Sequence, residues 1–376
     1  MADIRGSWDD RFQGVADTLA ASLDSGGDVG ASVAVLVDGE PVVDIWGGFA
    51  DEQRTVPWQS DTLTNVWSTT KTMTFLCALM LADRGLLDFH APVAEYWPEF
   101  AAAGKASVEV RHVMGHTAGL AGWTEPLRPE ELADWERCTS LLAAQEPWWE
   151  PGSASGYHAV TQGYLIGELV RRITGDSIGT WFAREVARPL GADFHIGLAE
   201  SEDHRVAPVI PPPPIDIEAL QPSSYALRAL SNPPLDASLS HQAWWRRAEI
   251  PAANGQGNAR SVAAVQSVIA GGGAARGVRL LSEQGCAPIF EQQADGTDLV
   301  LSTPLRFGMG YGLANEMMPI GPRACYWGGY GGSLIIMDMD TRLTVSYVMN
   351  RMESGLVGDA RGANLVMAAV LGLTAA

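Results

Sequence analysis

The chain has 376 residues, of which 47% are hydrophobic and 18% are charged, a composition typical of a folded globular protein and not of a disordered or fibrous one. Its formal net charge of −19 repels a phosphate backbone, which excludes nucleic acids and anionic membranes as expected partners. No apolar run approaches the roughly 20 residues of a membrane span, and no signal peptide is visible. The four cysteines lack the spacing of a zinc or redox site. We therefore expect a soluble cytoplasmic monomer or oligomer without a metal or another cofactor.

The first predicted elements are a helix and a β-hairpin. Apolar residues recur at helical spacing over residues 8–25. Two β-rich runs then flank Asp38 and Gly39, a pair that favours a tight turn between antiparallel strands.

The middle of the chain is predicted to be mostly helical, with helices that end at glycines such as Gly175 and Gly191. Prolines dominate from about residue 207 to residue 236, and residues 211–214 are four consecutive prolines. We expect no helix or strand in this segment, because proline lacks an N–H and restricts the backbone. A segment of this length is either a linker or a functional loop over a site, and the helix and strand patterns on both sides favour the loop.

Strand patterns return near the C-terminus. A glycine-rich run over residues 326–332 leads into a hairpin that turns at Asp340 and Thr341, and a helix is expected over about residues 359–373. Strands near both ends of the chain predict an α/β fold of the α+β type, with one antiparallel sheet flanked by helices.

These elements also suggest how the chain is divided. We expect residues 1–85 and 255–376 to form an α/β domain around the antiparallel sheet. Residues 86–254 are expected to form an inserted, mostly helical region that includes the Pro-rich loop 207–236.

The strongest chemical signal is the pair Ser68 and Lys71. A spacing of three places both side chains on one side of the first helical turn. The apolar helix that follows predicts burial, which lowers the pKa of a lysine and leaves more neutral amine at pH 7. A neutral amine beside a hydroxyl acts as its base, whereas arginine keeps its proton. Only one other lysine, Lys105, occurs among 25 basic residues, which favours a chemical reason for Lys71.

A structural alternative exists for both residues. Ser68 has the residue type of a helix N-cap, and Lys71 could be a surface lysine whose stem lies along apolar groups. A Ser-x-x-Lys motif arises by chance roughly once or twice in an average chain of this length. With two lysines in the chain, the chance expectation is much lower.

The motif Ser68-x-x-Lys71 at the head of a buried helix resembles the first motif of class C β-lactamases, penicillin-binding proteins and family VIII carboxylesterases. The segments VRHVMGHTAGL and WEPGSASGYHAVTQGYLIGELVRRITG are similar to segments that follow in this superfamily. The likeness runs over about residues 33–191 and resumes near residue 255 and at YWGGYGGS. It implies a β-lactamase/transpeptidase-like fold and a serine nucleophile that forms an acyl-enzyme.

The second motif of the superfamily, Tyr-x-Asn, falls on Tyr157-His158-Ala159. The tyrosine is kept and the asparagine is not. The resemblance implies that Tyr157 lies beside Lys71, helps to deprotonate the serine and protonates the leaving group. Without the resemblance, Tyr157 would be an ordinary buried tyrosine ahead of a helix.

The third motif, Lys-Thr-Gly, falls on Trp327-Gly328-Gly329. The resemblance implies an oxyanion hole made by the backbone N–H groups of Ser68 and Tyr330. An indole and two glycines supply no charge for the carboxylate of a β-lactam, so this departure favours a neutral, apolar ester. The glycines suggest an edge strand that approaches the substrate closely, or alternatively a bulge.

Five tryptophans lie in segments expected around the site: Trp67, Trp123, Trp148, Trp149 and Trp327. Pockets for uncharged groups are usually lined by apolar and aromatic side chains. We expect Trp123, Trp327, Gly328 and Gly329 to contact the substrate.

Two other patterns carry less weight. The run GSASG has Ala154 where a nucleophile elbow needs serine. His112 and His116 are four residues apart, but the glutamate of a zinc protease is missing and Gly115 lies between them, so a structural pair is favoured over a metal site.

The sequence thus predicts a serine carboxylesterase that hydrolyses small, short-chain esters through an acyl-enzyme on Ser68, with Lys71 and Tyr157 as base and acid. A β-lactamase, a D-amino-acid peptidase or an acyltransferase remain alternatives on the same fold. The missing motifs argue against the first two. A non-catalytic binder is disfavoured, since it has no need of a lysine in an apolar site.

Overall fold

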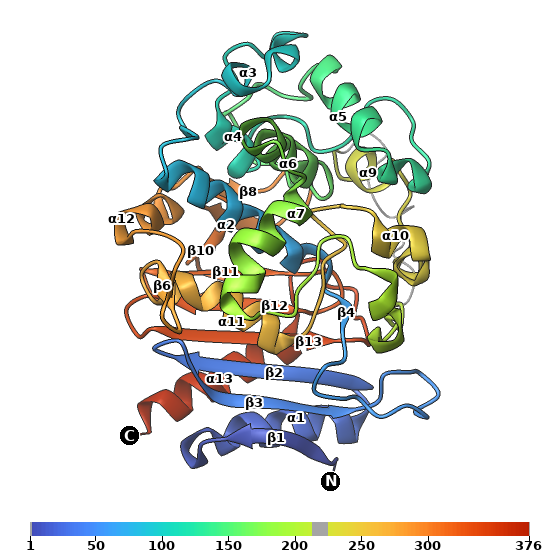
Figure 1. Ribbon diagram of the computed structural model, residues 1–376, viewed down its shortest axis with the longest axis vertical. Helices are drawn as coiled ribbons and strands as arrows, with labels where there is room; N and C mark the ends of the chain where they lie inside the picture. The colour runs from blue at the N-terminus through green and yellow to red at the C-terminus, as the bar shows by residue number, and fades with distance from the viewer. Residues whose placement is uncertain (1, 213–224, 376) are drawn as a thin grey trace.

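The computed structural model describes residues 2–212 and 225–375, and strands from both ends of the chain form one sheet in it (Figure 1). The sheet has nine strands in the order β1-β3-β2-β13-β12-β11-β10-β9-β8, all antiparallel to their neighbours. Its strands are β1 (Ile4–Trp8), β2 (Gly30–Val37), β3 (Glu40–Gly48), β8 (Ala294–Thr297), β9 (Pro304–Phe307), β10 (Gly312–Leu313), β11 (Ala324–Gly328), β12 (Leu334–Asp338) and β13 (Leu343–Met349). Two further pairs are β4 (Thr64–Asn65) with β5 (Gln256–Gly257), and β6 (Ala274–Ala275) with β7 (Val278–Arg279).

Helices make up most of the remaining regular structure. They are α1 (Gln13–Ser25), α2 (Thr70–Asp83), α3 (Val93–Tyr96), α4 (Val110–Met114), α5 (Trp135–Ala144), α6 (Thr161–Thr174), α7 (Ile178–Phe182), α8 (Arg188–Leu190), α9 (Tyr225–Leu230), α10 (Ala243–Arg247), α11 (Ala259–Ala270), α12 (Glu283–Cys286) and α13 (Ala360–Thr374). None of the helices in the described part of the chain is long and apolar enough to cross a membrane.

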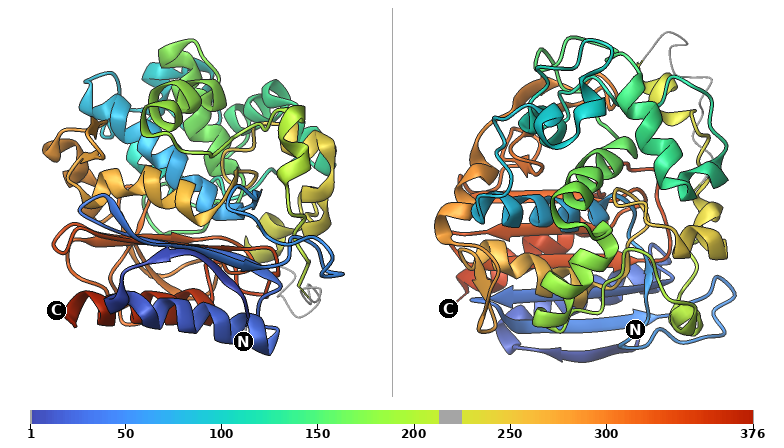
Figure 2. Two further views of the ribbon diagram at one scale, coloured as in Figure 1. Left: turned by 60° about the horizontal axis from the view of Figure 1, so that its bottom comes forward. Right: turned by 45° about the horizontal axis from the view of Figure 1, so that its top comes forward.

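Helices cover both faces of the sheet (Figure 2, left). On one face, α1 and α13 pack against each other and against β3 and β13. On the other face, α11 crosses β2, β12 and β13, and α2 lies on α11 and in turn contacts α6 and α7. The predicted α+β fold, with one antiparallel sheet flanked by helices, is confirmed.

The predicted hairpins and helix ends are confirmed as well. Asp38 and Gly39 connect β2 to β3 with positive φ angles of 53° and 78°, as the tight turn of a two-residue hairpin requires. The helices α6 and α8 end at Gly175 and Gly191, both in the left-handed conformation. The side chain of Asp359 accepts an N–H at the start of α13.

Two expectations are wrong. First, α9 lies within the segment 207–236, where no helix was expected, because residues 225–230 (YALRAL) contain no proline and favour a helix. Residues 213–224, which include two of the four consecutive prolines, lie outside the described residues. Second, β11 is not an edge strand over its whole length, because β10 pairs with Cys325 and Tyr326. In the described part of the chain, Trp327 and Gly328 at the end of β11 pair only with β12.

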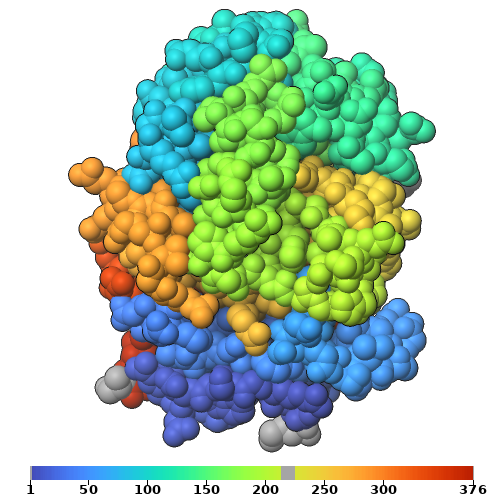
Figure 3. All heavy atoms as spheres, viewed as in Figure 1, coloured from blue at the N-terminus to red at the C-terminus, as the bar shows by residue number. Residues whose placement is uncertain are grey.

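The buried helix expected after Ser68 is α2. Every residue from Thr70 to Leu81 is buried, since this helix lies between α11 and α6. In the space-filling view of Figure 3, the light-green residues of α7 and α8 cover the face in front of it. Because α2 contacts both the sheet side and the helical side, the division into residues 1–85 with 255–376 and residues 86–254 stays a prediction.

Candidate active site

Ser68 lies in the turn that leads into α2. Residues 67–69 form a single 3₁₀ turn, and Trp67 has a φ of 48°, a left-handed conformation that is unusual for a bulky side chain. The indole of Trp67 packs between the rings of Trp245 and Tyr330, each with a centroid distance of 5.5 Å. Such strained backbone persists where the surrounding structure holds it, and it is common beside catalytic groups.

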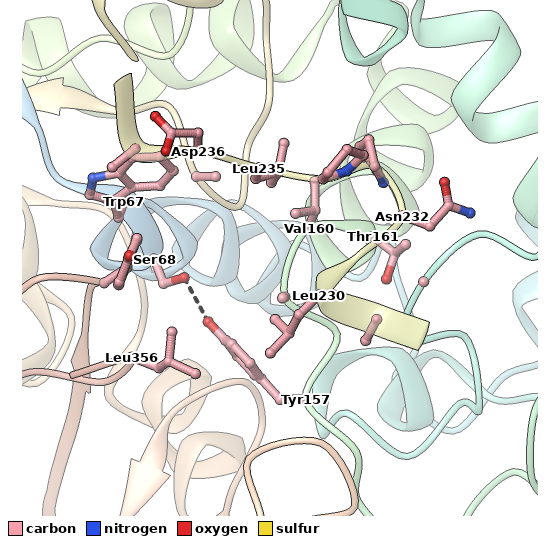
Figure 4. A pocket seen from close by; sticks show the side chains of 18 of the residues that line it. Trp67, Ser68, Tyr157, Val160, Thr161, Leu230, Asn232, Leu235, Asp236 and Leu356 are labelled. Carbon is pink, nitrogen blue, oxygen red and sulfur yellow. Dashed lines mark hydrogen bonds between the residues drawn. The ribbon is translucent and has the colours of Figure 1, made fainter. Parts of the chain in front are cut away.

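The structure brings Ser68, Lys71 and Tyr157 together. Lys71 Nζ lies 3.0 Å from Ser68 Oγ, and the Tyr157 hydroxyl donates a hydrogen bond of 2.7 Å to the same oxygen. Figure 4 shows the tyrosine hydroxyl directed at the serine, and both side chains line a pocket. Ser68 Oγ therefore contacts one potential base and one potential acid.

The surroundings of Lys71 fit a neutral amine. Its Nζ donates to the carbonyl oxygens of Ala159, at 2.6 Å, and Ala252, at 2.9 Å. The side chain is fully buried, and this burial lowers its pKa well below the ordinary value. A neutral amine has two N–H groups and one lone pair. If the two carbonyls take both hydrogens, the lone pair is left for the hydroxyl of Ser68.

Tyr157 has the opposite shift. Its ring is buried, and burial raises the pKa of the phenol, so it keeps its proton at neutral pH. The backbone N–H of Tyr157 donates to the buried carboxylate of Asp298 at 3.0 Å. Behind the ring lie His116 and Trp327, with centroid distances of 5.0 and 5.5 Å. The tyrosine is thus held rigidly as a protonated donor facing Ser68.

Gly328 and Gly329 allow protein segments to approach one another closely. A Cβ added to Gly328 would lie 2.5 Å from the backbone nitrogen of Gly358. At Gly329 it would lie 2.3 Å from the carbonyl oxygen of Val66 and 3.3 Å from the backbone nitrogen of Ser68. These atoms belong to the protein, so substrate contact by the two glycines stays a prediction.

The close approach at Gly329 brings the next residue, Tyr330, to the nucleophile. The backbone N–H groups on either side of Tyr330 already have acceptors, because Gly329 donates to the carbonyl of Ser333 and Gly331 donates to the carbonyl of Gly355. Within residues 2–212 and 225–375, the N–H of Tyr330 has no acceptor. A free N–H at this position is what an oxyanion hole shared with Ser68 requires.

Substitution of Gly329 by alanine is expected to lower kcat for the ester hydrolysis predicted from the sequence by about 10²–10³-fold. The added methyl group displaces the Tyr330 segment from Ser68, while the φ of residue 329 is one that alanine adopts. Steady-state kinetics with p-nitrophenyl acetate measures the effect. Gly321→Ala is the control, because its added Cβ meets nothing closer than 3.4 Å. Equal activity of the two variants would contradict this role.

A cavity of about 350 Å³ opens beside Ser68, Tyr157 and Tyr330 (Figure 4). Most of its wall is apolar and includes Ala121, Val160, Leu230, Leu235, Ala253 and Leu356. In the described lining there is no Lys, Arg or His, and Asp236 is the one charged side chain. A cavity with this lining suits a small molecule whose reacting part is uncharged.

Of the tryptophans expected at the site, Trp67 and Trp123 line this cavity. Trp327 is fully buried and packs behind Tyr157, outside the described lining. Its contact with substrate therefore stays a prediction, and its position supports a role in holding the tyrosine. Two parts of the Pro-rich segment 207–236 also reach the cavity, at residues 211–212 and 232–236.

Three groups at the site escape prediction from the sequence. The carbonyls of Ala159 and Ala252 bind Lys71, and no side-chain pattern marks a main-chain acceptor. Asp236 reaches the cavity from a segment whose packing depends on the whole fold. Its sequence signal is weak, since an aspartate two residues before Ser238 indicates only a helix cap or a local turn.

His158, which the sequence did not single out, connects two walls of the site. Burial lowers its pKa to about 4, so the ring is neutral at pH 7. Its Nδ1–H then donates to the carbonyl of Gly156, and Nε2 accepts the N–H of Leu120. This bridge fixes the segment of Tyr157 beside the wall that contains Trp123.

No metal centre surrounds the histidines. Among residues 2–212 and 225–375, no group of three or more His, Cys, Asp or Glu side chains is arranged to hold a metal ion. His112 accepts the N–H of Glu109, and His116 accepts the N–H of His158. The four cysteines are unpaired and buried.

Comparisons with known proteins agree with this geometry. The Beta-lactamase family matches residues 15–368. The esterase/beta-lactamase LipL of Mycobacterium tuberculosis is 38% identical over 370 residues, which cover 94% of this chain and 84% of that protein. A crystal structure of a family VIII carboxylesterase is similar at 43% identity and a TM-score of 0.93, covering 98% of this chain and 100% of that one.

A penicillin-binding protein homologue from Caulobacter crescentus is also similar, at 37% identity and a TM-score of 0.91, over 98% of this chain and 100% of that one. These relatives are named for different activities. The chemistry of the pocket in this chain therefore has to distinguish between them.

Proposed function

The chain belongs to the beta-lactamase family, and from this premise we propose that it is a carboxylesterase that hydrolyses small, short-chain esters through an acyl-enzyme on Ser68. It is a serine hydrolase with a β-lactamase/transpeptidase-like fold, as the resemblance implied. The observation that carries the proposal is the position of Lys71 Nζ. This nitrogen is held by two carbonyl oxygens, and its third hydrogen-bond contact is Ser68 Oγ.

In the first half-reaction, Ser68 Oγ attacks the ester carbonyl carbon while its proton moves to Lys71 Nζ. The backbone N–H groups of Ser68 and Tyr330 hold the negative charge that forms on the carbonyl oxygen. When the carbon–oxygen bond breaks, Tyr157 donates its proton to the leaving alkoxide, and protonated Lys71 restores it. The products of this step are the alcohol and an acyl group on Ser68.

In the second half-reaction, water attacks the acyl group. Its proton leaves through Tyr157 and Lys71, and Ser68 Oγ departs as the hydroxyl by the reverse sequence. The acid is released and both Lys71 and Tyr157 return to their neutral forms. No group beyond the side chains and main chain of the site is required for either step.

The lining favours esters over β-lactams. A β-lactam carries a carboxylate that a Lys-Thr-Gly motif would meet, and here Trp327, Gly328 and Gly329 occupy that motif. No Lys or Arg lines the described cavity to replace it. Residual β-lactam hydrolysis is a second candidate, because LipL is named for both activities and both reactions use a serine acyl-enzyme. A D-amino-acid peptidase is disfavoured on the same ground.

The proposal is tested with a p-nitrophenyl acyl series beside a chromogenic cephalosporin. We expect rapid turnover of the acetate and butyrate esters, decline with longer chains, and slow or no turnover of the cephalosporin. Ser68→Ala is expected to lose at least about 10⁴-fold in kcat, and a fluorophosphonate is expected to label the native protein but not this variant. Absence of both a burst and turnover with every short-chain aryl ester would exclude an esterase.

The remaining alternatives give different results in the same assays. An acyltransferase would form a new ester when an alcohol acceptor is added, at the expense of the free acid. A non-catalytic binder would neither react with the fluorophosphonate nor hydrolyse any ester. We also propose a cytoplasmic location, which the four free, buried cysteines support because reducing compartments keep thiols unpaired.

A further inference from the structure

One carboxylate lines an otherwise uncharged cavity. Asp236 belongs to the described lining together with Trp67 and Tyr330, and its side chain is exposed to solvent. Figure 4 shows Asp236 and Trp67 at the same end of the pocket. Asp236 also interacts electrostatically with the phenol of Tyr330. The carboxylate and the two aromatic rings therefore form one corner of the cavity.

Local hydrogen bonds fix the orientation of Asp236. Its Oδ1 accepts the backbone N–H of Ser238 at 2.8 Å and the hydroxyl of the same residue, so Asp236 caps the 3₁₀ helix Ala237–His241. These hydrogen bonds hold the pKa of Asp236 below its usual range, so the group is ionised at neutral pH. In the described part of the chain, Oδ2 has no hydrogen-bond partner. The corner thus presents a fixed negative charge with a free oxygen.

No basic side chain in the described lining neutralises this charge. Arg228, on the helix that supplies Ala229 and Leu230 to the wall, stacks on the ring of Trp148 at 4.0 Å instead. His241 is the last residue of the 3₁₀ helix that Asp236 caps, and it contributes electrostatically to the lowered pKa of Asp236, but its Nε2 is bound to the carbonyl of Val209. The sequence of residues 213–224 contains no Lys or Arg either.

A carboxylate beside aromatic rings is a combination that attracts an organic cation. The ring pair of Trp67 and Tyr330, 5.5 Å apart and nearly perpendicular, supplies the aromatic part. We propose that Asp236, with Trp67 and Tyr330, makes this enzyme prefer esters that carry an ammonium group over their uncharged analogues, and discriminate against esters that carry a carboxylate. This inference rests on the proposed esterase activity and names its substrate class.

The test uses two substrates of equal shape. Butyrylcholine and 3,3-dimethylbutyl butyrate differ only in a quaternary nitrogen that replaces a carbon. Hydrolysis of both esters is measured by titrating the released acid at constant pH. We expect kcat/KM of the native enzyme to be about five- to twentyfold higher for the choline ester at low salt. The preference is expected to decrease as salt screens the charge. The mono-butyl ester of succinic acid, an anion, is expected to be a poor substrate.

The decisive variant is Asp236→Asn, which removes the charge while asparagine still caps the helix. The ratio of kcat/KM between the choline and dimethylbutyl esters is expected to fall to near one. The succinate half-ester is expected to improve. Asp134→Asn is the matched control, because Asp134 is an exposed helix cap outside the described lining of the cavity. This control is expected to leave the ratio unchanged.

Binding measured on Ser68→Ala separates this inference from the esterase proposal. Dissociation constants of the two butyrate esters are determined by calorimetry, where hydrolysis does not interfere, and the same preference is expected. If the uncharged ester is hydrolysed but neither kcat/KM nor binding favours the choline ester, Asp236 has no such role and the esterase proposal stands. If no ester is hydrolysed, the esterase proposal fails, and the binding ratio still decides whether the corner selects cations.

Discussion

Replacement of Lys71 by methionine is expected to lower kcat for p-nitrophenyl butyrate by about 10³-fold or more. Methionine has a similar length and fits the buried position, but it cannot accept the proton of Ser68. Lys71→Arg is expected to be equally inactive, because a guanidinium keeps its proton in proteins. The rate of fluorophosphonate labelling measures the same loss at the acylation step.

The chain contains a matched control for this substitution. Lys105 is also fully buried, and its Nζ donates to the carbonyls of Ala102 and Gln145. Lys105→Met therefore removes a buried amine with two carbonyl partners at a position with no contact to Ser68. It is expected to reduce the free energy of unfolding, since unpaired buried carbonyls cost about 1–3 kcal/mol each, but to retain kcat. If both variants keep activity, Lys71 is structural and another base must act on Ser68.

The pH profile tests the same role in the native enzyme. Lys71 acts as a base only when it is neutral, so activity is present above its pKa and is lost as pH falls through it. Because burial lowers this pKa well below the ordinary value, we expect activity to reach its plateau at a pH well below the ordinary pKa of a lysine, with an acidic limb below that plateau. A rate that rises steadily to pH 10 would indicate a lysine with an ordinary pKa.

The comparison of the two lysines also shows what the sequence could reveal about the site. Rarity marked Lys71 as a residue kept for a reason, yet Lys105 is equally rare and equally buried. Rarity therefore identified buried lysines in this chain, not catalytic ones. The apolar helix after Ser68 and the spacing of three carried the correct local information, because Ser68 lies in the 3₁₀ turn that leads into α2 and Lys71 lies in the first turn of α2.

Other parts of the site depend on contacts between distant segments. Tyr157 is 89 residues from Ser68, and only the resemblance to a known superfamily connected the two. The carbonyls of Ala159 and Ala252 and the carboxylate of Asp236 reach the site through the packing of three separate segments. Sequence periodicity describes one segment at a time, so it does not show which distant segments come into contact in the folded protein.

The strands that were and were not predicted show the same limit of sequence patterns. The hairpin at Asp38-Gly39 and the strands β12 and β13 have long apolar runs and a clear turn signal, and they were predicted. The strand β1 was missed because its side chains are largely exposed, which leaves no alternation of apolar residues to detect. The strands β9 and β10 are short and separated by a glycine-rich bend at residues 308–310, so the true edge of the sheet was not recognised.

Substitution of Tyr157 by phenylalanine is expected to lower kcat by about 10²–10³-fold for an alkyl ester. The phenyl ring keeps its packing against His116 and Trp327, so the fold and the cavity are retained. What is lost is the hydroxyl that donates to Ser68 Oγ at 2.7 Å and that protonates the departing alkoxide in the proposed mechanism. Because burial raises the pKa of this phenol, it remains a proton donor at neutral pH.

The leaving group distinguishes an acid from a merely structural tyrosine. p-Nitrophenolate departs without a proton, whereas an alkoxide needs one, so the loss in Tyr157→Phe should be much smaller for p-nitrophenyl butyrate than for ethyl butyrate. Tyr164→Phe is the control, because Tyr164 is another buried tyrosine whose hydroxyl donates to the carbonyl of Leu132. It is expected to affect stability and not this ratio. Equal losses for both esters would mean that Tyr157 positions Ser68 and Lys71 itself delivers the proton to the leaving group.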